Sequence, residues 1–257
     1  MGVRLLTIGI LLYSAVATAQ LSGQFYMEKE SYNLGEPIFL YFRVVNDGKK
    51  AETLEVEDHT SSGCSPYTIR VARDWPTETH HSSSCRAQAL RALSMICGGR
   101  KTTLQPGETY VDHVLLNFGH NVDAAGGYSV GASSGDRGTG AHAVSNATLR
   151  FLVQAKPADK KVFQPWIDRL RSTDGMERLE AANLLANIAP PSLEDLLLTF
   201  AEDPSVQNYA PLAFHRLNSP RSIAALKWLS ENSRDAWVQQ QASDYLANDA
   251  CRGDFWP

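Results

Sequence analysis

The sequence contains little that would point to nucleic-acid binding or to a membrane-embedded protein. Of its 257 residues, 24 are basic and 28 are acidic, and no long run of like charge is present. The sequence therefore shows no cluster of basic residues that could form the basic face that nucleic-acid binding requires. After residue 19, no apolar run approaches the length that spans a bilayer. We therefore expect no nucleic-acid partner and no transmembrane segment in the mature chain.

Recognisable catalytic and metal-binding motifs are also missing. The sequence has no H-E-x-x-H or C-x-x-C pattern, the spacings that identify many zinc sites. Ser133-Ser134-Gly135 lies in a Gly-rich stretch without the strand-turn-helix pattern that surrounds a hydrolase nucleophile. The adjacent pair His80-His81 lies in a polar stretch beside Glu78 and offers the side chains that metals bind. A surface loop is the simpler interpretation of that pair. We expect no catalytic residue, no metal and no cofactor.

The start of the chain has a pattern typical of export. One arginine precedes an apolar run from Leu5 to Val16, and Ala17-Thr18-Ala19 then forms an A-x-A cleavage site. The apolar run is too short to span a bilayer as a helix. We expect a signal peptide over residues 1–19, a mature chain that begins at Gln20, and a periplasmic or secreted protein.

Export changes the interpretation of the four cysteines, because disulfides form in oxidising compartments. Cys85 and Cys97 flank an expected helix over residues 86–96, and a loop of that length closes easily. We predict a disulfide between these two residues. Cys64 then either pairs with Cys251, which would link the two halves of the chain, or leaves Cys251 free. The sequence does not choose among the pairings.

The residue pattern changes near Pro157. Before it, glycines are frequent and short runs alternate apolar with polar side chains, which is typical of strands. After it, glycines are rare and apolar residues recur at helical spacing. We expect a strand-rich domain over residues 20–156 and a helical domain over 157–257, joined by residues 156–160. The expected strands are residues 24–32, 36–46, 54–57, 67–72, 110–116, 127–131 and 146–154.

Short motifs in the strand-rich half resemble a known family. In order, they are Leu34-Gly35-Glu36-Pro37-Ile38, Val45-Asn46, Leu104-Gln105-Pro106-Gly107-Glu108 and Gly126-Gly127-Tyr128-Ser129-Val130. They resemble the bacterial immunoglobulin-like domains of exported proteins, including the group named after a Bacillus proteinase inhibitor. The resemblance covers roughly residues 24–155 and implies an antiparallel immunoglobulin-like β-sandwich. This chain departs from that pattern by an inserted segment, residues 75–101, which carries Cys85 and Cys97.

The helical half repeats itself at a period of about thirty residues, which is typical of a solenoid of paired helices. The residues at equivalent places are small or β-branched: Ala182, Ala210, Ala242, Val206 and Val238. With the turn Asp203-Pro204-Ser205-Val206, the pattern resembles HEAT repeats over residues 174–249. It implies two helix pairs followed by a single helix, and an α+β chain of two domains overall.

Both resemblances imply binding scaffolds, so the leading hypothesis is a non-catalytic protein-interaction scaffold of the bacterial cell envelope. The expected contact surfaces are the concave face of the solenoid and the insertion 75–101. One alternative is a secreted proteinase inhibitor, in which the loop closed by Cys85 and Cys97 would enter a protease cleft. Another is a metal-dependent or other hydrolase, with His80 and His81 as metal ligands. The sequence predicts neither the partner nor the oligomeric state.

Overall fold

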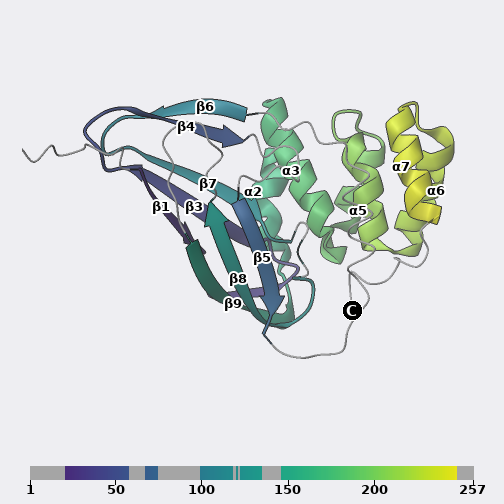
Figure 1. Ribbon diagram of the computed structural model, residues 1–257. Coiled ribbons are helices and arrows are strands. Elements are labelled where there is room, and N and C mark those ends of the chain that lie inside the picture. Colours follow the sequence, from purple (N-terminus) through teal and green to yellow (C-terminus); the bar gives the residue numbers. More distant parts are fainter. Residues whose placement is uncertain are drawn as a thin grey trace, which may run out of the picture.

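Strands fill the first part of the chain and helices fill the second. The computed structural model describes residues 21–57, 67–74, 99–117, 120, 122–134 and 146–247. Figure 1 shows the strands on one side of the molecule and the helices on the other. The strands are β1 (Leu21–Tyr26), β2 (Ser31–Leu34), β3 (Phe39–Asn46), β4 (Glu52–Glu57), β5 (Tyr67–Arg73), β6 (Gly99–Leu104), β7 (Thr109–Leu115), β8 (Gly126–Ser134) and β9 (Asn146–Pro157).

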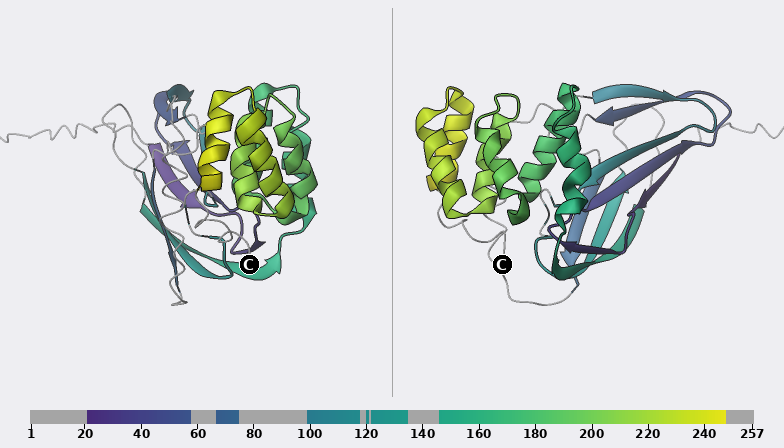
Figure 2. Two further views of the ribbon diagram at one scale, coloured as in Figure 1. Left: turned by 90° about the vertical axis from the view of Figure 1, so that its right-hand side faces the viewer. Right: turned by 180° about the vertical axis from the view of Figure 1, so that it is seen from behind.

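The helical part begins three residues after the last strand. Its α-helices are α2 (Gln164–Arg169), α3 (Gly175–Ile188), α4 (Glu194–Leu198), α5 (Ala210–Leu217), α6 (Pro220–Asn232) and α7 (Ala236–Ala247). Short 3-10 turns join them: η1 (Lys160–Phe163), η2 (Pro191–Leu193), η3 (Thr199–Ala201) and η4 (Gln207–Tyr209). Viewed from the helical end, the helices stand side by side (Figure 2).

The strands form two larger sheets and one separate pair. β1, β3 and β7 form an antiparallel sheet in that order, and β2, β9, β8 and β5 form the second. In the second sheet β2 pairs with β9 in parallel, which departs from the antiparallel arrangement that was expected, whereas the other pairs are antiparallel. β4 and β6 pair with each other in antiparallel register.

The structure also corrects two expectations about where the strands lie in the sequence. Residues 24–32 were expected to form one strand, but this part of the chain contains the end of β1 and the start of β2, which belong to different sheets. β6 was not expected, and it includes residues 99–101 of the predicted insertion. Its Gly-Arg-Lys-Thr-Thr-Leu sequence lacks a clear alternation of apolar and polar residues, so the usual strand signal is weak.

Both larger sheets contribute side chains to one hydrophobic core. Leu40, Phe42 and Val44 of β3 are buried, as are Tyr128 and Val130 of β8, and all belong to a single cluster. In both strands the buried residues alternate with more exposed ones, as expected when one face of each sheet is packed. The two sheets therefore face each other across this core, and each has an outer face directed away from it.

Two turns of the same design precede strands of this core. In Asn33-Leu34-Gly35-Glu36 and Gln105-Pro106-Gly107-Glu108, the glycines have φ values of 78° and 82°. Such values are accessible to glycine at little cost. In each turn the glutamate N–H donates to the carbonyl of the first residue, and its carboxylate accepts from that residue's N–H. The glutamates of both motifs therefore stabilise the turns.

Buried asparagines hold distant segments of the strand region together. Asn117 Oδ1 accepts from the Ile38 N–H at 2.7 Å, and Asn117 Nδ2 donates to the Glu36 carbonyl at 3.1 Å. Asn46 Nδ2 donates to the Leu104 carbonyl at 2.8 Å. These amides satisfy backbone groups that would otherwise be buried without partners.

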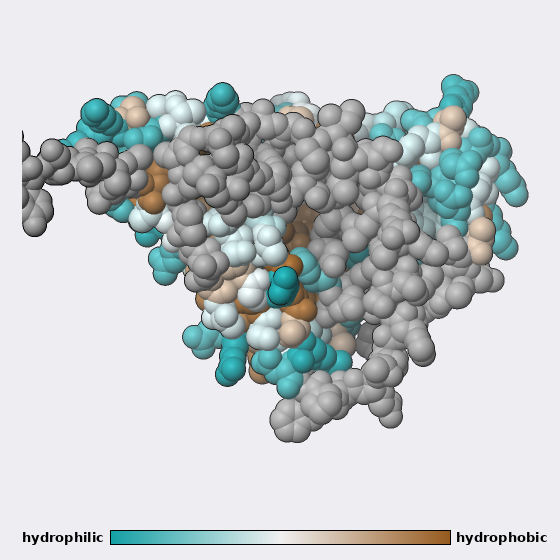
Figure 3. Space-filling view, in the orientation of Figure 1, coloured by the Kyte–Doolittle hydropathy of each residue, from teal (hydrophilic) through white to brown (hydrophobic). Residues whose placement is uncertain are grey.

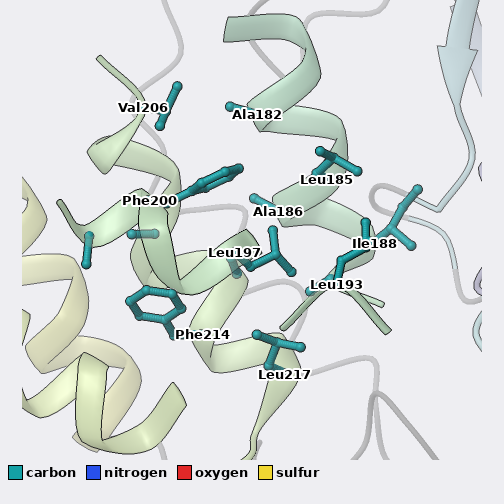
Figure 4. Packing of buried hydrophobic residues seen from close by; sticks show 14 of the residues in the cluster. Ala182, Leu185, Ala186, Ile188, Leu193, Leu197, Phe200, Val206, Phe214 and Leu217 are labelled. Carbon is teal, nitrogen blue, oxygen red and sulfur yellow. The ribbon is translucent and has the colours of Figure 1, made fainter. Parts of the chain in front are cut away.

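The helices share a second hydrophobic core. Figure 4 shows side chains from α3, from the turns η2 and η3, and from α5 pointing toward one another. Leu185, Leu197 and Phe214 are fully buried there, and Ala182, Ala210 and Ala242 are each 0% exposed. Alanine at these places allows neighbouring helices to approach closely, because the side chain ends at Cβ. The three alanines that the sequence singled out are therefore all part of this core.

α3 and α5 end in the same way. Ala189 follows α3 with φ 45°, and Asn218 follows α5 with φ 49°, so both lie in the left-handed region that commonly ends helices. A proline comes soon after each, at Pro190 and Pro220, and cannot continue the preceding helix. The recurrence of this ending in successive helix pairs supports a structural repeat.

The two regions meet where the sheet of β1, β3 and β7 reaches α2. Phe39 and Leu115 are register partners at one end of this sheet, and both pack against the helical core. The Phe39 ring lies 5.7 Å from the Trp166 ring of α2, measured between centroids. Seen from behind, this end of the sheet lies beside the helices (Figure 2). The strand region thereby covers one end of the helical core, a role that capping repeats perform in stacked repeat proteins.

Candidate functional site

The structure places few of the residues that the sequence singled out. Cys64, Cys85, Cys97 and Cys251 all lie outside the described residues, and so do His80 and His81. The Cys85–Cys97 and Cys64–Cys251 pairings therefore stay predictions. Residues 1–19 and most of the insertion 75–101 also lie outside the described residues.

The described residues offer no cluster of metal-ligating groups. No group of three or more His, Cys, Asp or Glu side chains suited to a metal ion occurs among them. Across the same part of the chain, no helix is both long and apolar enough to cross a membrane.

His215 is buried inside the helical region. Its ring stacks on that of Tyr245, with 4.5 Å between the centroids and 15° between the planes. Burial raises the pKa of Tyr245 to about 12, so this phenol is neutral at ordinary pH. These side chains join α5 to α7 by packing.

The outer face of the sheet β1–β3–β7 carries a row of aromatic side chains. The strand register places Tyr26, Tyr41 and His113 side by side across the three strands. Phe39 lies next to this row, on the same face of β3 and closer to the helices. His113 is exposed, whereas Tyr26, Phe39 and Tyr41 are half-buried. His113 and Tyr41 are register partners on this face.

The aromatic rings contact one another closely. Tyr26 and Tyr41 are stacked, with centroids 5.1 Å apart and planes 18° apart. The His113 ring meets Phe39 edge to face at 5.2 Å. With Trp166 of α2 beside Phe39, these five residues form a surface that we call the aromatic corner: Tyr26, Phe39, Tyr41, His113 and Trp166. Four of these residues lie on the sheet β1–β3–β7, and Trp166 lies on α2 at one side of them.

Charged side chains surround the aromatic corner. Arg169 lies 5.0 Å from the centroid of the Trp166 ring, a cation–π distance, and is ion-paired with Glu180 of α3. At the other side, burial and the nearby Glu28 carboxylate raise the pKa of Tyr41 above its ordinary value. Arg43 lies in the next row of the sheet, between Gln24 and Val111, and is exposed. Val111 is 44% exposed, which shows that this part of the face is open to solvent.

A second exposed apolar feature lies at the far end of the helices. Trp228 of α6 is 50% exposed and Trp237 of α7 is 38% exposed. The two residues flank the turn between α6 and α7, near the end of one helix and the start of the next. Elsewhere in the helical region, most of α5 and the second half of α3 are buried. In Figure 3 the helical end at the right is mainly hydrophilic, and hydrophobic atoms gather over the strands.

The sequence did not reveal the aromatic corner. Phe39 and Tyr41 stand two apart in an obvious strand, so both had to face the same side, opposite Leu40 and Phe42. That alternation was a usable signal. The approach of Trp166 from another part of the chain had no counterpart in local sequence, because it depends on how the two regions pack.

Residues 163–247 match the HEAT repeat family. The match begins earlier than the sequence pattern predicted and includes α2. The helical part of the chain is therefore similar to HEAT repeats. No curated protein matches the chain.

Among solved structures, the chain has weak similarity to β-glucosidases. A β-glucosidase from Listeria innocua in complex with glucose is 12% identical, with a TM-score of 0.28; the similarity covers 54% of this chain and 17% of the enzyme. EmGH1, a β-glucosidase from Erythrobacter marinus, is 14% identical with a TM-score of 0.27, over 52% of this chain and 15% of the enzyme. The chain thus spans less than a fifth of either enzyme, and at these TM-scores the similarity carries no inference about fold or activity.

Proposed function

We propose that this protein is an exported, non-catalytic protein-interaction scaffold of the bacterial cell envelope. The observation that carries the proposal is the HEAT repeat match over residues 163–247. Stacked helix pairs of this kind present extended surfaces that are suited to binding other proteins. Export is proposed from the signal-peptide pattern of residues 1–19.

The proposal includes a finer description of both regions. For the strand region it is an immunoglobulin-like sandwich, which is supported by two sheets that share one core. For the helical region it is a short solenoid, which is supported by the HEAT repeat match and by the single hydrophobic core that the helices share. Fold alone does not fix function, so the partner contacts have to be sought in particular side chains.

Trp228 and Trp237 are the proposed contact residues of the helical region. Tryptophan is enriched among the residues that dominate binding energy at protein interfaces. These two lie near one turn, at the end of the helices that is remote from the strand region (Figure 1). A partner that covered both would contact the turn between α6 and α7.

Cross-linking capture tests the proposal. The chain from Gln20 to Pro257 is used as bait in an envelope extract of the source organism, beside the double variant Trp228→Ala/Trp237→Ala. Met176→Ala is the matched control, because Met176 is an exposed apolar residue, 45% accessible, on a different helix.

Recovery of one dominant protein by the unchanged chain and by Met176→Ala, with strong loss in the tryptophan variant, is the expected result. Recovery of no specific protein would contradict the proposal. If the captured protein were a protease that the bait inhibits, the inhibitor hypothesis would replace it.

A further inference from the structure

We propose that Asp112 blocks the open edge of β7 against pairing with a further strand, in the first place with β7 of a second copy of this chain. The inference is independent of the proposed scaffold function, because it concerns how the strand region avoids self-association. Among the described strands β7 pairs only with β3, so its other side is a sheet edge. Edge strands present backbone groups that can pair with another chain.

The hydrogen bonding between β3 and β7 shows which amides of β7 point to that edge. The Leu116 N–H donates to the Ile38 carbonyl, and the register of the two strands continues from there without a shift. Residues that bond to the partner strand alternate along an antiparallel ladder. The even-numbered residues of β7 therefore bond to β3, and the N–H groups of Val111 and His113 point away from it. Both residues are exposed.

The His113 N–H has an acceptor within its own strand. It donates to Asp112 Oδ1 at 2.8 Å, although Asp112 belongs to the inward face of β7 and is only 3% exposed. The other carboxylate oxygen, Oδ2, accepts from the hydroxyl of Tyr67 on β5 at 2.6 Å. Because β5 belongs to the second sheet, this bond joins the two sheets and holds the carboxylate in place.

This arrangement opposes an added strand in two ways. A carbonyl of the incoming strand would need the His113 N–H, which already donates to Asp112. The carboxylate would also repel that carbonyl oxygen. Inward-pointing charged residues on edge strands are among the means by which proteins avoid edge-to-edge association. An apolar residue at position 112 would avoid the cost of burying a charge, so the edge accounts for the aspartate where packing does not.

Sedimentation equilibrium of the purified chain from Gln20 to Pro257 tests the inference, because only copies of this chain are then present. Asp112→Ala removes the carboxylate, whereas Asp112→Asn keeps an oxygen that can accept from the His113 N–H. Asn46→Ala is the control for lost stability: Asn46 is also buried and bonds to backbone, but it lies on β3 rather than on the edge strand. Circular dichroism and thermal melting check that each variant is folded.

We expect Asp112→Ala to self-associate at least about tenfold more tightly than the unchanged chain, and Asp112→Asn to change association less. Asn46→Ala should associate no more tightly than the unchanged chain. Adding His113→Pro to Asp112→Ala removes the N–H that an incoming strand would use and leaves the bonds to β3 intact. The second substitution should therefore reverse the gain in association.

Amide hydrogen exchange followed by NMR provides a test on the unchanged chain. The N–H groups of Val111 and His113 point to the same edge, and that of His113 is bonded to the Asp112 carboxylate. After correction for intrinsic rates, we expect the His113 amide to exchange about tenfold more slowly than the Val111 amide.

Four results would overturn the inference. The first is a folded Asp112→Ala variant that associates no more tightly than the unchanged chain. The second is an equal gain in Asn46→Ala, which would make association a consequence of lost stability. The third is association that His113→Pro does not reverse. The fourth, which stands even if Asp112→Ala fails to fold, is equal exchange of the Val111 and His113 amides. None of these results bears on the capture experiment, so the proposed scaffold function is judged separately.

Discussion

Side-chain hydrogen bonds within the strand region join residues that lie much farther apart in the sequence than those within the helical region. In the strand region, the side-chain bonds that fix the sheets join residues far apart in sequence: Asn117 reaches back 79 residues to Ile38, and Asn46 reaches 58 residues forward to Leu104. In the helical region, Arg178 bonds to Asp203 over 25 residues and Arg216 to Asn187 over 29. The helical contacts recur at roughly the repeat length, whereas the sheet contacts do not repeat.

The two regions also differ in how they satisfy polar groups. The strand region uses buried amides that bond to backbone, and removal of one of these leaves a buried group unpaired. Apart from the buried bond of Arg216 to the Asn187 carbonyl, the helical region has ion pairs near the surface, as between Arg178 of α3 and Asp203 or between Arg221 of α6 and Asp195 of α4. Exposed pairs contribute little. We therefore expect unequal responses to mutation in the two regions.

The largest expected effect comes from the helical core. Phe214 is fully buried between α5 and its neighbours, and Phe214→Ala should lower the free energy of unfolding by about 3–5 kcal/mol. Urea denaturation followed by circular dichroism measures this. Phe42→Ala, in the core of the strand region, is the matched change, and both variants should lower the midpoint of the same transition if the two regions unfold together. Separate transitions would show that they are independent.

Asn117 gives the next largest effect. Asn117→Ala leaves the Ile38 N–H and the Glu36 carbonyl without their side-chain partner, and we expect a loss of about 2 kcal/mol in the free energy of unfolding. The control is Asn232→Ala at the exposed end of α6, where the amide bonds only to the Trp228 carbonyl; this change should have little effect. Equal losses at both positions would contradict the contrast drawn between the two regions.

The smallest expected effect is pH-dependent. A hydrogen bond from Ser205, together with Arg178, lowers the pKa of Asp203 below its ordinary value. The stabilisation is therefore present above pH ~4 and is lost as pH falls through the pKa of the folded state. Since both side chains are partly exposed, Arg178→Ala should cost about 0.5 kcal/mol at neutral pH. Urea titrations from pH 7 to pH 3 should show this difference disappear in acid; a difference that grew in acid would oppose the assignment.

Residue patterns in the sequence predicted the helical region better than they predicted the arrangement of the sheets. Apolar spacing and alanine recurrence gave the repeat, and the HEAT match confirmed it. Alternation also gave β3, β5, β7 and β9. The alternation of apolar and polar residues did not predict β6, whose residues are mostly polar. It also did not predict that residues 24–32 are divided between β1 and β2. Those features depend on which distant strand lies alongside, and periodicity carries no such information.

The candidate site was harder to predict than the fold. The sequence directed attention to cysteines and to His80 and His81, all of which lie outside the described residues. The aromatic corner combines residues from β1, β3, β7 and α2, so each member looks ordinary within its own segment. Only the packing of the two regions brings Trp166 to Phe39.

The central claim is that the strand region covers and stabilises one end of the helical core. Hydrogen exchange of the Phe39→Ala variant, measured by mass spectrometry, tests this claim most directly. Phe39 is the ring that contacts Trp166, and its loss should expose the end of the helical core. We predict that amides of α2 and of the adjoining part of α3 exchange about tenfold faster than in the unchanged chain, while those of α6 and α7 are unaffected. Unchanged exchange throughout the helices would contradict the account, because it would mean that the two regions touch without stabilising each other.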